Sequence, residues 1–577
     1  MSGYPRPRNV PATPLGDLAA LIAARIEAPT APPAPTRPTA PPVPAVTGIT
    51  HASDAVVAGD LYAALPGSRR HGAEFVAEAA AAGALAVLTD PAGADRAVAA
   101  GLPALVVDDP RAVLGIVGSR VYGDPSRHLT VIGITGTAGK TSTAYLIESG
   151  LRAAGRTAGL IGTVETRLGG LVVDSARTTP EATDLQAVLA AARQYGVDTV
   201  VMEVSSHALA LGRVDGVRFA VGGFTNLGAD HLDFHADMAA YFAAKARLFD
   251  GRCAIEIVNV GDPYGRRLVR PGTVTYVGPA AGVTAAEGFG GGVTAGEGFA
   301  TDLTAADGFG NDVTVADWRA SDVTAAGEGG FGQRFVVHGP GGVAVDAGVS
   351  MPGRHNVANA LLAIASLVAI GVDAAVAARG VADCPGVPGR MERVPAPGPV
   401  IGVVDYAHKP DSVTEVLAAL RPLVAAKSSR GRRVTAGSGR VICVIGAGGD
   451  RDRGKRPLMG TAAARGADVV IVTDDNPRTE SPAAIRAELL AAARAAGGAD
   501  VTEVEGRRAA VDEAVRLAAP GDVVALLGKG HERGQEIDGA VYPFDDRVAL
   551  SAALTTRFGP LTGGPVGTEP ASVGGPR

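Results

Sequence analysis

A glycine-rich segment that ends in Lys-Thr is the most informative pattern in this chain of 577 residues. Residues 133–142 read GITGTAGKTS and lie between an apolar strand-like run and a helix-like run. Backbone N–H groups in such a turn, together with a helix N-terminus, bind phosphate groups. Lys140 would neutralise β- and γ-phosphate oxygens, and the Thr141 hydroxyl would contact Mg²⁺. We therefore predict a nucleotide-binding loop, although Ile134 breaks the strict GxxxxGK[ST] pattern and an ordinary strand-to-helix turn is the alternative.

Candidate metal ligands follow this loop. Glu203 ends the apolar run TVVME, which predicts a position at the ligand-binding edge of a parallel sheet. The alternative for Glu203 is a helix-capping or solvated side chain. Residues 230–235, DHLDFH, add two carboxylates and two imidazoles, among them His231. Zn²⁺ is conceivable, but Mg²⁺ with mixed oxygen and nitrogen ligands is favoured beside a phosphate-binding loop.

Lys245 falls inside the apolar stripe of a predicted helix over residues 236–250. A lysine that faces inward must extend its ammonium group to the surface, pair, change its pKa or be modified. Periodicity alone favours a structural lysine that reaches the surface.

Alternating strand-like and helix-like runs predict an α/β fold with parallel sheets, and the length is typical of three to four domains. The first 45 residues are rich in proline, so we expect a disordered tail with one short helix near residues 15–26. The predicted segments are a tail over 1–45, a small α/β domain over 46–125, a central domain over 126–384, a third α/β domain over 385–556 and a flexible tail over 557–577.

A ten-residue repeat interrupts the central domain at residues 281–330. Val-Thr or Leu-Thr recurs every ten residues between residues 283 and 324, and Gly-Phe recurs with the same period in the first part of the repeat. A small strand-turn repeat and a low-complexity surface loop are both compatible with this pattern. We favour a partly ordered surface loop, because Gly and Ala leave little to bury, and we assign it no chemistry.

Composition excludes several classes of protein. The formal net charge of −6 argues against binding of nucleic acid or of an anionic membrane surface. The three cysteines lie far apart without metal-site spacing, which fits a reducing compartment. No apolar run is long enough to insert into a membrane, and the first residues lack the apolar core of a signal peptide. We therefore expect a soluble cytoplasmic protein.

Several blocks, in one order, resemble the ATP-dependent Mur ligase family of peptidoglycan synthesis, and especially its diaminopimelate-adding members. The blocks include GTAGKTS, TTP, MEVSSHAL, FTNLGADHLDFH, GRHNVANALLA, DYAHKPDS, DDNPRTE and GKGHE. The resemblance covers about residues 46–555, apart from the repeat and the basic stretch 427–440. It implies three domains: a small uridine-nucleotide domain, a central P-loop ATPase domain with a parallel sheet, and a C-terminal Rossmann-like domain for the amino acid.

The resemblance also implies a reaction. ATP would phosphorylate the D-Glu γ-carboxylate of UDP-MurNAc-L-Ala-D-Glu, and an amine of diaminopimelate would attack the acyl phosphate to give an amide, ADP and phosphate. Mg²⁺ would assist, and a CO₂-derived carbamate on Lys245 would hold a second magnesium. A monomer is expected. Phosphorylation suits this chemistry because a free carboxylate is a poor electrophile, and phosphoryl transfer depends mainly on positioning and charge neutralisation.

Residue roles follow from the matching motifs. The implied catalytic residues are Lys140, Glu203, His231 and Lys245, and the metal ligands are Thr141, Glu203, His231 and carbamylated Lys245. The implied ATP contacts are Gly136, Thr137, Ala138, Gly139, Lys140, Thr141, Ser142, Asn356, Asp405, Tyr406 and His408, with Asn359 in a similar place. The muramyl substrate would contact Ser53, Ser68, Arg69, Arg70, Thr178, Thr179, Ser205 and Arg213. Diaminopimelate would contact Arg451, Asp475, Asn476, Pro477, Arg478, Gly528 and Glu532.

Arg478 is the residue expected to select the amino acid. Diaminopimelate carries one more carboxylate than lysine, and an Arg fork matches a carboxylate in bidentate fashion. Lysine-adding relatives lack this Arg, whereas Glu532 would pair with the distal ammonium group. A surface salt bridge is the alternative role for Arg478. The competing functions are a lysine-adding Mur ligase, a folylpolyglutamate synthetase-like ligase, a P-loop ATPase that is not a ligase, and a paralogue that only binds.

Overall fold

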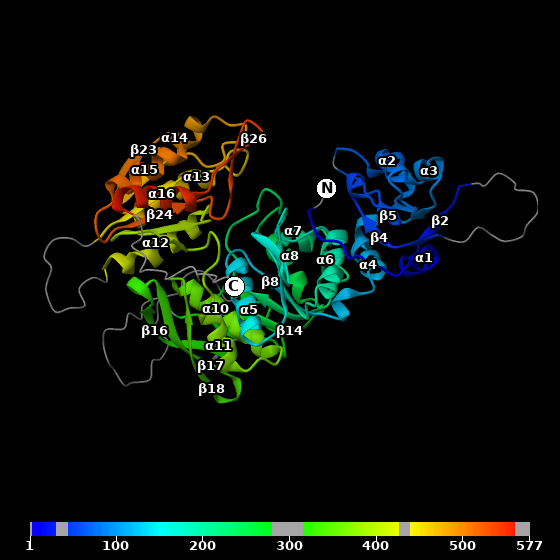
Figure 1. Cartoon of the computed structure of the whole chain (residues 1–577), viewed down its shortest axis with the longest axis horizontal. Helices are drawn as coiled ribbons and strands as arrows, with labels where there is room; N and C mark the ends of the chain where they lie inside the picture. The colour runs from blue at the N-terminus through cyan, green and yellow to red at the C-terminus, as the bar shows by residue number, and fades with distance from the viewer. Residues whose placement is uncertain (1–2, 30–43, 68, 280–315, 426–438, 560–577) are drawn as a thin grey trace, which may run out of the picture. The chain divides into compact units, whose positions relative to one another are not determined.

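The structure is a computed structural model that describes residues 3–29, 44–67, 69–279, 316–425 and 439–559 (Figure 1). The chain divides into two compact units. The first unit comprises Met1–Gly327, Gly332–Ser350 and Arg354–Pro385, and the second comprises Glu328–Phe331, Met351–Gly353 and Gly386–Arg577. Among the described residues, no helix combines the length and apolar character needed to cross a membrane.

The N-terminal part of the first unit is a small α/β sandwich. Its described sheet has the order β2-β7-β6-β5-β4, in which β2 is antiparallel to β7 and the other pairs are parallel. The elements are β3 (Ala45–Val46), β4 (Gly48–Thr50), η1 (Ser53–Ala55), β5 (Asp60–Ala63), η2 (Gly72–Phe75), α2 (Val76–Ala81), β6 (Ala86–Thr89), α3 (Pro91–Ala99), β7 (Ala104–Val106), α4 (Pro110–Val121) and η3 (Pro125–Arg127).

The expectation of a disordered tail is wrong for residues 3–29, which contain regular secondary structure. They form β1 (Thr13–Pro14), α1 (Leu15–Ile22) and β2 (Arg25–Glu27), and β2 joins the sheet of the sandwich. The short helix expected near residues 15–26 is present, but it ends earlier. Leu15 and Leu18 are fully buried in the core of the sandwich, so apolar burial outweighs the stiff, proline-rich composition. Residues 30–43 lie outside the described residues.

The central part of the first unit is a large sheet flanked by helices. Within the described residues its order is β11-β10-β9-β12-β8-β13-β14-β15-β16-β17-β18, with a parallel middle from β9 to β16 and antiparallel strands at both ends. The strands are β8 (Thr130–Thr135), β9 (Ala158–Ile161), β10 (Glu165–Leu168), β11 (Leu171–Asp174), β12 (Thr199–Glu203), β13 (Phe219–Phe224), β14 (Cys253–Asn259), β15 (Val274–Val277), β16 (Trp318–Ala326), β17 (Gly332–Gly339) and β18 (Val343–Val349). The helices are α5 (Lys140–Ala153), α6 (Ala182–Gln194), α7 (Ser206–Ala210), α8 (Met238–Ala246), η4 (Arg247–Phe249), α9 (Pro263–Arg266), η6 (Pro340–Gly342), α10 (Arg354–Ala369) and α11 (Ala374–Ala382), whereas η5 (Glu328–Gly330) is assigned to the second unit.

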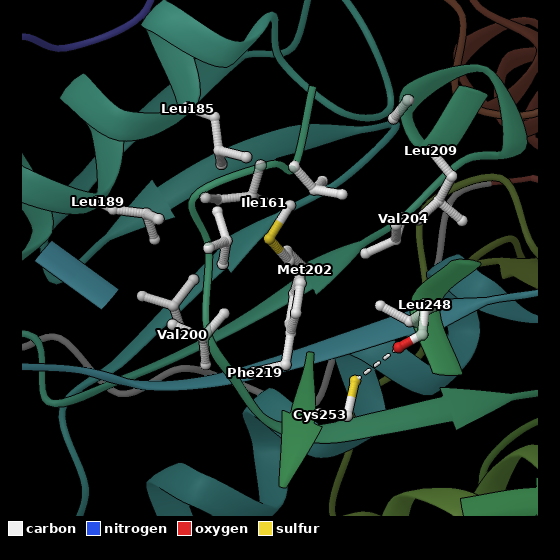
Figure 2. Close-up of a cluster of buried hydrophobic side chains, with 14 of the residues drawn as sticks. Ile161, Leu185, Leu189, Val200, Met202, Val204, Leu209, Phe219, Leu248 and Cys253 are labelled. Atoms are coloured by element: carbon white, nitrogen blue, oxygen red, sulfur yellow. Dashed lines mark hydrogen bonds between the residues drawn. The ribbon is translucent and has the colours of Figure 1, made fainter. Parts of the chain in front are cut away.

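A continuous apolar cluster fixes the strands that carry the candidate site. Figure 2 shows Leu185 and Leu189 of α6 packed toward Val200 and Met202 of β12. In the same cluster, the Cys253 thiol donates a hydrogen bond to the Leu248 carbonyl oxygen over 3.1 Å. Because the neighbouring strands β8, β12 and β13 run parallel, their carboxyl ends lie at one edge of the sheet.

The predicted repeat is partly a strand. Val323 and Thr324, the last repeat pair, lie in β16, which pairs with β15 and β17 rather than forming a surface loop. Trp318 is only 3% exposed and anchors the start of this strand, so burial of one aromatic ring orders a segment poor in other apolar residues. Residues 281–315 of the repeat lie outside the described residues.

The second unit is a Rossmann-like α/β domain. Its described six strands have the order β19-β20-β24-β21-β22-β23, parallel except for β19. The elements are β19 (Glu392–Val394), β20 (Ile401–Asp405), α12 (Pro410–Ala425), β21 (Val441–Ile445), α13 (Lys455–Gly466), β22 (Val469–Val472), α14 (Pro482–Ala496), β23 (Asp500–Glu503), α15 (Arg507–Leu517), β24 (Val523–Leu527), a hairpin of β25 (Gly534–Ile537) and β26 (Ala540–Pro543), and α16 (Asp546–Phe558). The predicted α/β fold class is confirmed. Most of the basic stretch and of the expected C-terminal tail, residues 426–438 and 560–577, lie outside the described residues.

Candidate functional site

The glycine-rich loop connects β8 to α5 with a backbone that only glycine tolerates at two points. Gly136 has φ +144° and Gly139 has φ +86°. A Cβ atom on Gly136 would lie 1.8 Å from Thr225 Oγ1, and one on Gly139 would lie 2.4 Å from Asn359 Oδ1. The two glycines therefore serve both conformation and close approach, which is the requirement of a phosphate-binding turn.

Side chains from the neighbouring strand hold the rest of this loop. The Ala138 N–H donates to Asn226 Oδ1 over 2.9 Å, and Thr225 Oγ1 donates to the Ala138 carbonyl oxygen over 2.6 Å. The Thr137 hydroxyl lies 3.0 Å from the Tyr241 hydroxyl of α8. The loop is thus positioned by the side chains of two residues just after β13 and by one contact from α8.

Two lysines converge on one carbonyl group of the loop. Lys140 Nζ and Lys245 Nζ each donate to the Gly136 carbonyl oxygen over 2.8 Å. Lys245 is 1% exposed, and its Nζ lies 4.6 Å from the centroid of the Tyr241 ring. The interpretation from periodicity, a lysine that reaches the surface, is wrong, because Lys245 points at the phosphate-binding loop. Two cations on one acceptor repel each other, and an anion placed between them would reduce this repulsion.

Glu203 is buried and receives three hydrogen bonds. Thr141 Oγ1 donates to Glu203 Oε2 over 3.0 Å, the Thr163 N–H donates to Oε1 over 2.7 Å, and Thr163 Oγ1 donates to Oε2 over 3.1 Å. The side chain is 1% exposed, so the solvated alternative is wrong, and its bonds to Thr141 and Thr163 are not those of a helix cap. The structure places the Thr141 hydroxyl and the Glu203 carboxylate side by side, a pair of oxygen ligands that suits Mg²⁺.

His231 lies in an aromatic group that includes Tyr241 of α8. Its Nε2 is 3.0 Å from Asp230 Oδ2, and its ring meets the rings of His207 and Tyr241. Burial, reinforced by the neighbouring His231 and His235, lowers the pKa of His207 to about 4. In the described part of the chain, no three His, Cys, Asp or Glu side chains gather closely enough to hold a metal ion. Of the predicted metal set, Thr141 and Glu203 are joined by a hydrogen bond, and Lys245 donates to the Gly136 carbonyl oxygen of the adjacent loop.

The residues predicted for the peptidyl end meet at the same edge. Thr179 Oγ1 donates to the Glu203 carbonyl oxygen over 2.9 Å and accepts from the Ser205 N–H over 3.1 Å. The Thr178 hydroxyl lies 3.1 Å from that of Thr163. Thr179 therefore bonds the backbone on both sides of the end of β12, and Thr178 contacts Thr163, which in turn bonds the Glu203 carboxylate.

Arg213 belongs to a neighbouring ionic group. Its guanidinium pairs with Glu181 over 2.8 Å, and burial lowers the pKa of Arg213. Among the described residues, its buried Nε atom has no hydrogen-bond partner. An orphaned donor of this kind is suited to an anionic ligand.

The predicted uridine contacts have local partners. Ser53 Oγ lies 3.4 Å from Glu78 Oε2, and Arg70 pairs with Glu74 while its guanidinium covers the Phe75 ring. Arg69 is exposed in the same turn, and Ser68 lies outside the described residues.

The asparagines of α10 border the loop. Asn359 Nδ2 donates to Asn356 Oδ1 over 3.2 Å, and both side chains are buried. Asn359 also faces Gly139, as its close approach shows. Ser142 is buried in the first turn of α5. These predicted ATP contacts are therefore gathered around the loop.

The other predicted ATP contacts are in the second unit, where Asp405 ends β20 and Tyr406 and His408 follow it. The Asp405 carboxylate accepts from the backbone N–H groups of Met391 and Ala407 over 2.6 and 2.7 Å. Tyr406 packs against the rings of His408 and His531. Burial raises the pKa of Tyr406 to about 12. All of these groups lie at the carboxyl edge of that sheet.

The guanidinium group of Arg478 is held by two contacts. Its Nε donates to Glu536 Oε2 over 2.9 Å, and its Nη1 donates to the Gly449 carbonyl oxygen over 2.7 Å. Nη2 takes part in neither bond. The salt bridge foreseen as the alternative role is present, and it orients the guanidinium group without using all of it. Gly449 approaches the Pro477 carbonyl so closely that a Cβ atom would lie 1.9 Å from it.

A second group of predicted amino-acid contacts surrounds a lysine that sequence reasoning missed. Asn476 Nδ2 donates to Glu532 Oε2 over 2.8 Å, and a Cβ atom on Gly528 would lie 2.4 Å from Asp475 Oδ2. Lys529 is fully buried, and its Nζ donates to Asn476 Oδ1 and Glu532 Oε2 over 3.0 and 3.2 Å. The signal for Lys529 was its place inside GKGHE, at the end of an apolar strand. Arg451 is exposed beside Gly448, near the same loops.

Family models match most of the chain. The model described as Mur ligase family, catalytic domain, matches residues 45–122, the Mur ligase middle domain matches 134–278, and the Mur ligase, glutamate ligase domain, matches 389–530. The UDP-N-acetylmuramoyl-L-alanyl-D-glutamate--2,6-diaminopimelate ligase of Streptomyces avermitilis is 50% identical to this chain, over 96% of this chain and 98% of that protein. The chain belongs to the Mur ligase family.

Solved structures agree with that assignment. A structure of UDP-N-acetylmuramoyl-L-alanyl-D-glutamate--2,6-diaminopimelate ligase is 28% identical with a TM-score of 0.59, covering 90% of this chain and 97% of that one. The folylpolyglutamate synthase of Mycobacterium tuberculosis, solved with ADP and AMPPCP, has a TM-score of 0.52 at 19% identity, covering 78% of this chain and 95% of that one. This second similarity shows a shared fold and no more.

Proposed function

We propose that this protein is an ATP-dependent ligase that joins diaminopimelate to the D-Glu γ-carboxylate of UDP-MurNAc-L-Ala-D-Glu during the synthesis of peptidoglycan precursors. The observation that carries the proposal is the assembly of Thr141, Glu203 and Thr179 around one sheet edge beside the glycine-rich loop. Relatives with the same activity in their names are about half identical over nearly the whole chain.

The first step, phosphoryl transfer, needs a bound ATP triphosphate next to the γ-carboxylate of the substrate. Lys140 and the N–H groups of the loop would hold the β- and γ-phosphates of ATP, because they form the positive start of α5. Thr178, Thr179 and Ser205 would hold the peptidyl end of the substrate with hydroxyl groups at the same edge. This arrangement supplies the alignment and the charge neutralisation on which phosphoryl transfer depends.

Magnesium fits the oxygen ligands of Thr141 and Glu203, and the family resemblance adds His231 as a further proposed ligand. A bound Mg²⁺ ion would neutralise charge on the phosphate oxygens. We also propose that Lys245 is carbamylated by CO₂. The buried ammonium group beside Lys140 supports this, because a carbamate replaces the repulsion between two cations with an attraction.

The amino-acid site would lie in the second unit, at the carboxyl edge of its sheet. Arg478 would bind the distal carboxylate of diaminopimelate with the part of its fork that Glu536 and Gly449 leave open. Glu532 would face the distal ammonium group, and Lys529 would orient Glu532 and Asn476. Asp405, Tyr406 and His408 would contact the adenine and ribose of ATP.

The remaining expectations concern the state of the protein. We propose a monomer in the cytoplasm, where the substrates of precursor synthesis are made. Among the described residues, Cys253 and Cys443 are free and buried, which supports a reducing compartment.

The test is release of ADP from purified enzyme with UDP-MurNAc-L-Ala-D-Glu and either diaminopimelate or lysine. We expect negligible ADP without both the nucleotide substrate and the amine, and at least ~10²-fold preference for diaminopimelate. ATP turnover without the amine would indicate a P-loop ATPase instead. Glutamate addition to tetrahydrofolate would indicate a folylpolyglutamate synthetase-like ligase.

A further inference from the structure

The segment Tyr4–Asn9, here called the N-terminal strap, is fastened at three places in the first unit. Tyr4 is 8% exposed and belongs to the apolar cluster of the central sheet. Its hydroxyl donates to the Arg177 carbonyl oxygen and accepts from the Arg177 N–H, each over 3.3 Å. One side chain thus contacts both polar groups of a single backbone residue.

The other two anchors lie on different parts of the unit. Arg6 donates to both carboxylate oxygens of Asp60 over 2.8 and 2.5 Å, and Asp60 is 1% exposed at the start of β5. Gln194, at the end of α6, accepts from the Arg8 N–H over 2.8 Å and donates to the Asn9 carbonyl oxygen over 3.1 Å. The strap therefore ties the small sandwich to the central sheet.

Arg177 connects the strap to the candidate site through a short series of contacts. The next residue, Thr178, lies 3.1 Å from Thr163 through its hydroxyl, and Thr163 donates two hydrogen bonds to the carboxylate of Glu203. Thr179 follows and bonds the Glu203 carbonyl oxygen. Because Thr178 and Thr179 directly follow Arg177, fixing the backbone at Arg177 limits where their hydroxyls can point.

We propose that the N-terminal strap is a positioning element, in which Tyr4 fixes the Arg177 backbone and so aligns Thr178 and Thr179 for the peptidyl end of the muramyl substrate. This inference rests on the proposed function, because that function assigns the two threonines to the substrate. Tyr4 acts through Arg177 and does not itself touch the reacting groups. Its contribution should therefore appear in affinity for the muramyl nucleotide and not in affinity for ATP.

The test is the Tyr4→Phe variant, which removes both hydrogen bonds and keeps the buried ring. We expect the KM for UDP-MurNAc-L-Ala-D-Glu to rise about three- to tenfold, since one or two hydrogen bonds of ordinary strength are lost. The KM for ATP and the kcat at saturation should stay within about twofold of wild type. The matched control is Arg8→Ala, because Arg8 is exposed and contributes only its backbone N–H to the strap.

Two further measurements separate the possible outcomes. An unchanged KM for the muramyl nucleotide in Tyr4→Phe overturns the proposal. A lower melting temperature with a parallel rise in both KM values also overturns it, since that pattern describes a structural role alone. If the wild-type enzyme shows no ligation, the proposed function fails; calorimetric binding of UDP-MurNAc-L-Ala-D-Glu to wild type and Tyr4→Phe then tests the strap separately, and equal dissociation constants would reject it.

Discussion

The phosphate-binding loop of the first unit and the amino-acid residues of the second unit are built by different means. The loop depends on backbone geometry: Gly136 and Gly139 occupy positive-φ conformations and lie against neighbouring side chains. The predicted diaminopimelate contacts depend on side-chain ion pairs and hydrogen bonds, such as Arg478 with Glu536 and Lys529 with Glu532. A site for a constant group such as triphosphate can be made from backbone, whereas a choice between two amino acids requires side chains that can be exchanged.

The largest effect is expected from breaking the backbone site. In Gly136→Ala the new methyl group would lie 1.8 Å from Thr225 Oγ1, so the loop must move. We expect kcat/KM for ADP release to fall by more than about 10²-fold, because displacement by about 1 Å has that effect on aligned groups. Gly170→Ala is the matched control, since a Cβ atom there meets nothing within 4 Å. Near-normal activity in Gly136→Ala would show that the loop geometry is not required.

The next effect concerns the choice of amino acid. Arg478→Ala should reduce the preference for diaminopimelate over lysine from ~10²-fold to below about tenfold, because the distal carboxylate loses its cation. Competition between the two amines in one ADP-release assay measures the ratio. Arg508→Ala, at an exposed ion pair with Asp512 in the same unit, serves as the control. If Arg478→Ala still discriminates fully, Arg478 does not select the amino acid.

A smaller effect is expected from the lysine behind these contacts. Lys529→Met removes the ammonium group that bonds Asn476 and Glu532 and leaves both groups without that partner. The KM for diaminopimelate should rise about tenfold while the KM for ATP changes little, as expected for the loss of a buried hydrogen-bonding partner. Equal changes in both KM values, accompanied by a lower melting temperature, would instead assign Lys529 to folding alone.

The smallest effect compares the two units through one half-buried histidine in each. Burial lowers the pKa of His355 to about 4 in the first unit and that of His531 to about 4 in the second, from an ordinary value of 6.5. Each imidazole is neutral in the fold but takes up a proton on unfolding below pH 6.5. Their contribution to stability is therefore complete above pH 6.5, is lost as the pH falls toward 4, and is constant below that.

Urea unfolding at pH 7 and pH 5 measures this dependence. The shift of the midpoint between the two pH values should be smaller in His355→Gln and in His531→Gln than in wild type. A variant with the same shift as wild type would show that its histidine is protonated equally in the folded and unfolded states.

Much of the first site could be predicted from local sequence. The Gly-Lys-Thr turn, with a strand before it and a helix after it, located the loop, and the end of an apolar run located Glu203. Lys245 was harder, because periodicity shows only that a helix side faces inward and not which group it meets. The structure shows that this group is the Gly136 carbonyl oxygen.

The contacts of the strap and of Lys529 could not be predicted from local sequence either, because their partners are distant in the chain. Proline-rich composition suggested disorder before residue 46, whereas Tyr4 and Arg6 find partners 173 and 54 residues away in the chain. Lys529 is likewise bonded to Asn476, 53 residues earlier. Composition and short motifs carry no information about such distant partners.

The order of motifs along the chain determined the α/β class, the nucleotide loop and the family resemblance, because these features arise from neighbours in sequence: a strand, a turn and a helix start. Only the tertiary structure decided that Glu203 is buried among hydroxyl donors, that two lysines share one carbonyl and that Arg478 is held by Glu536. The physical reason is that parallel strands bring distant segments to one sheet edge, where burial and hydrogen bonding fix the position of each charged group.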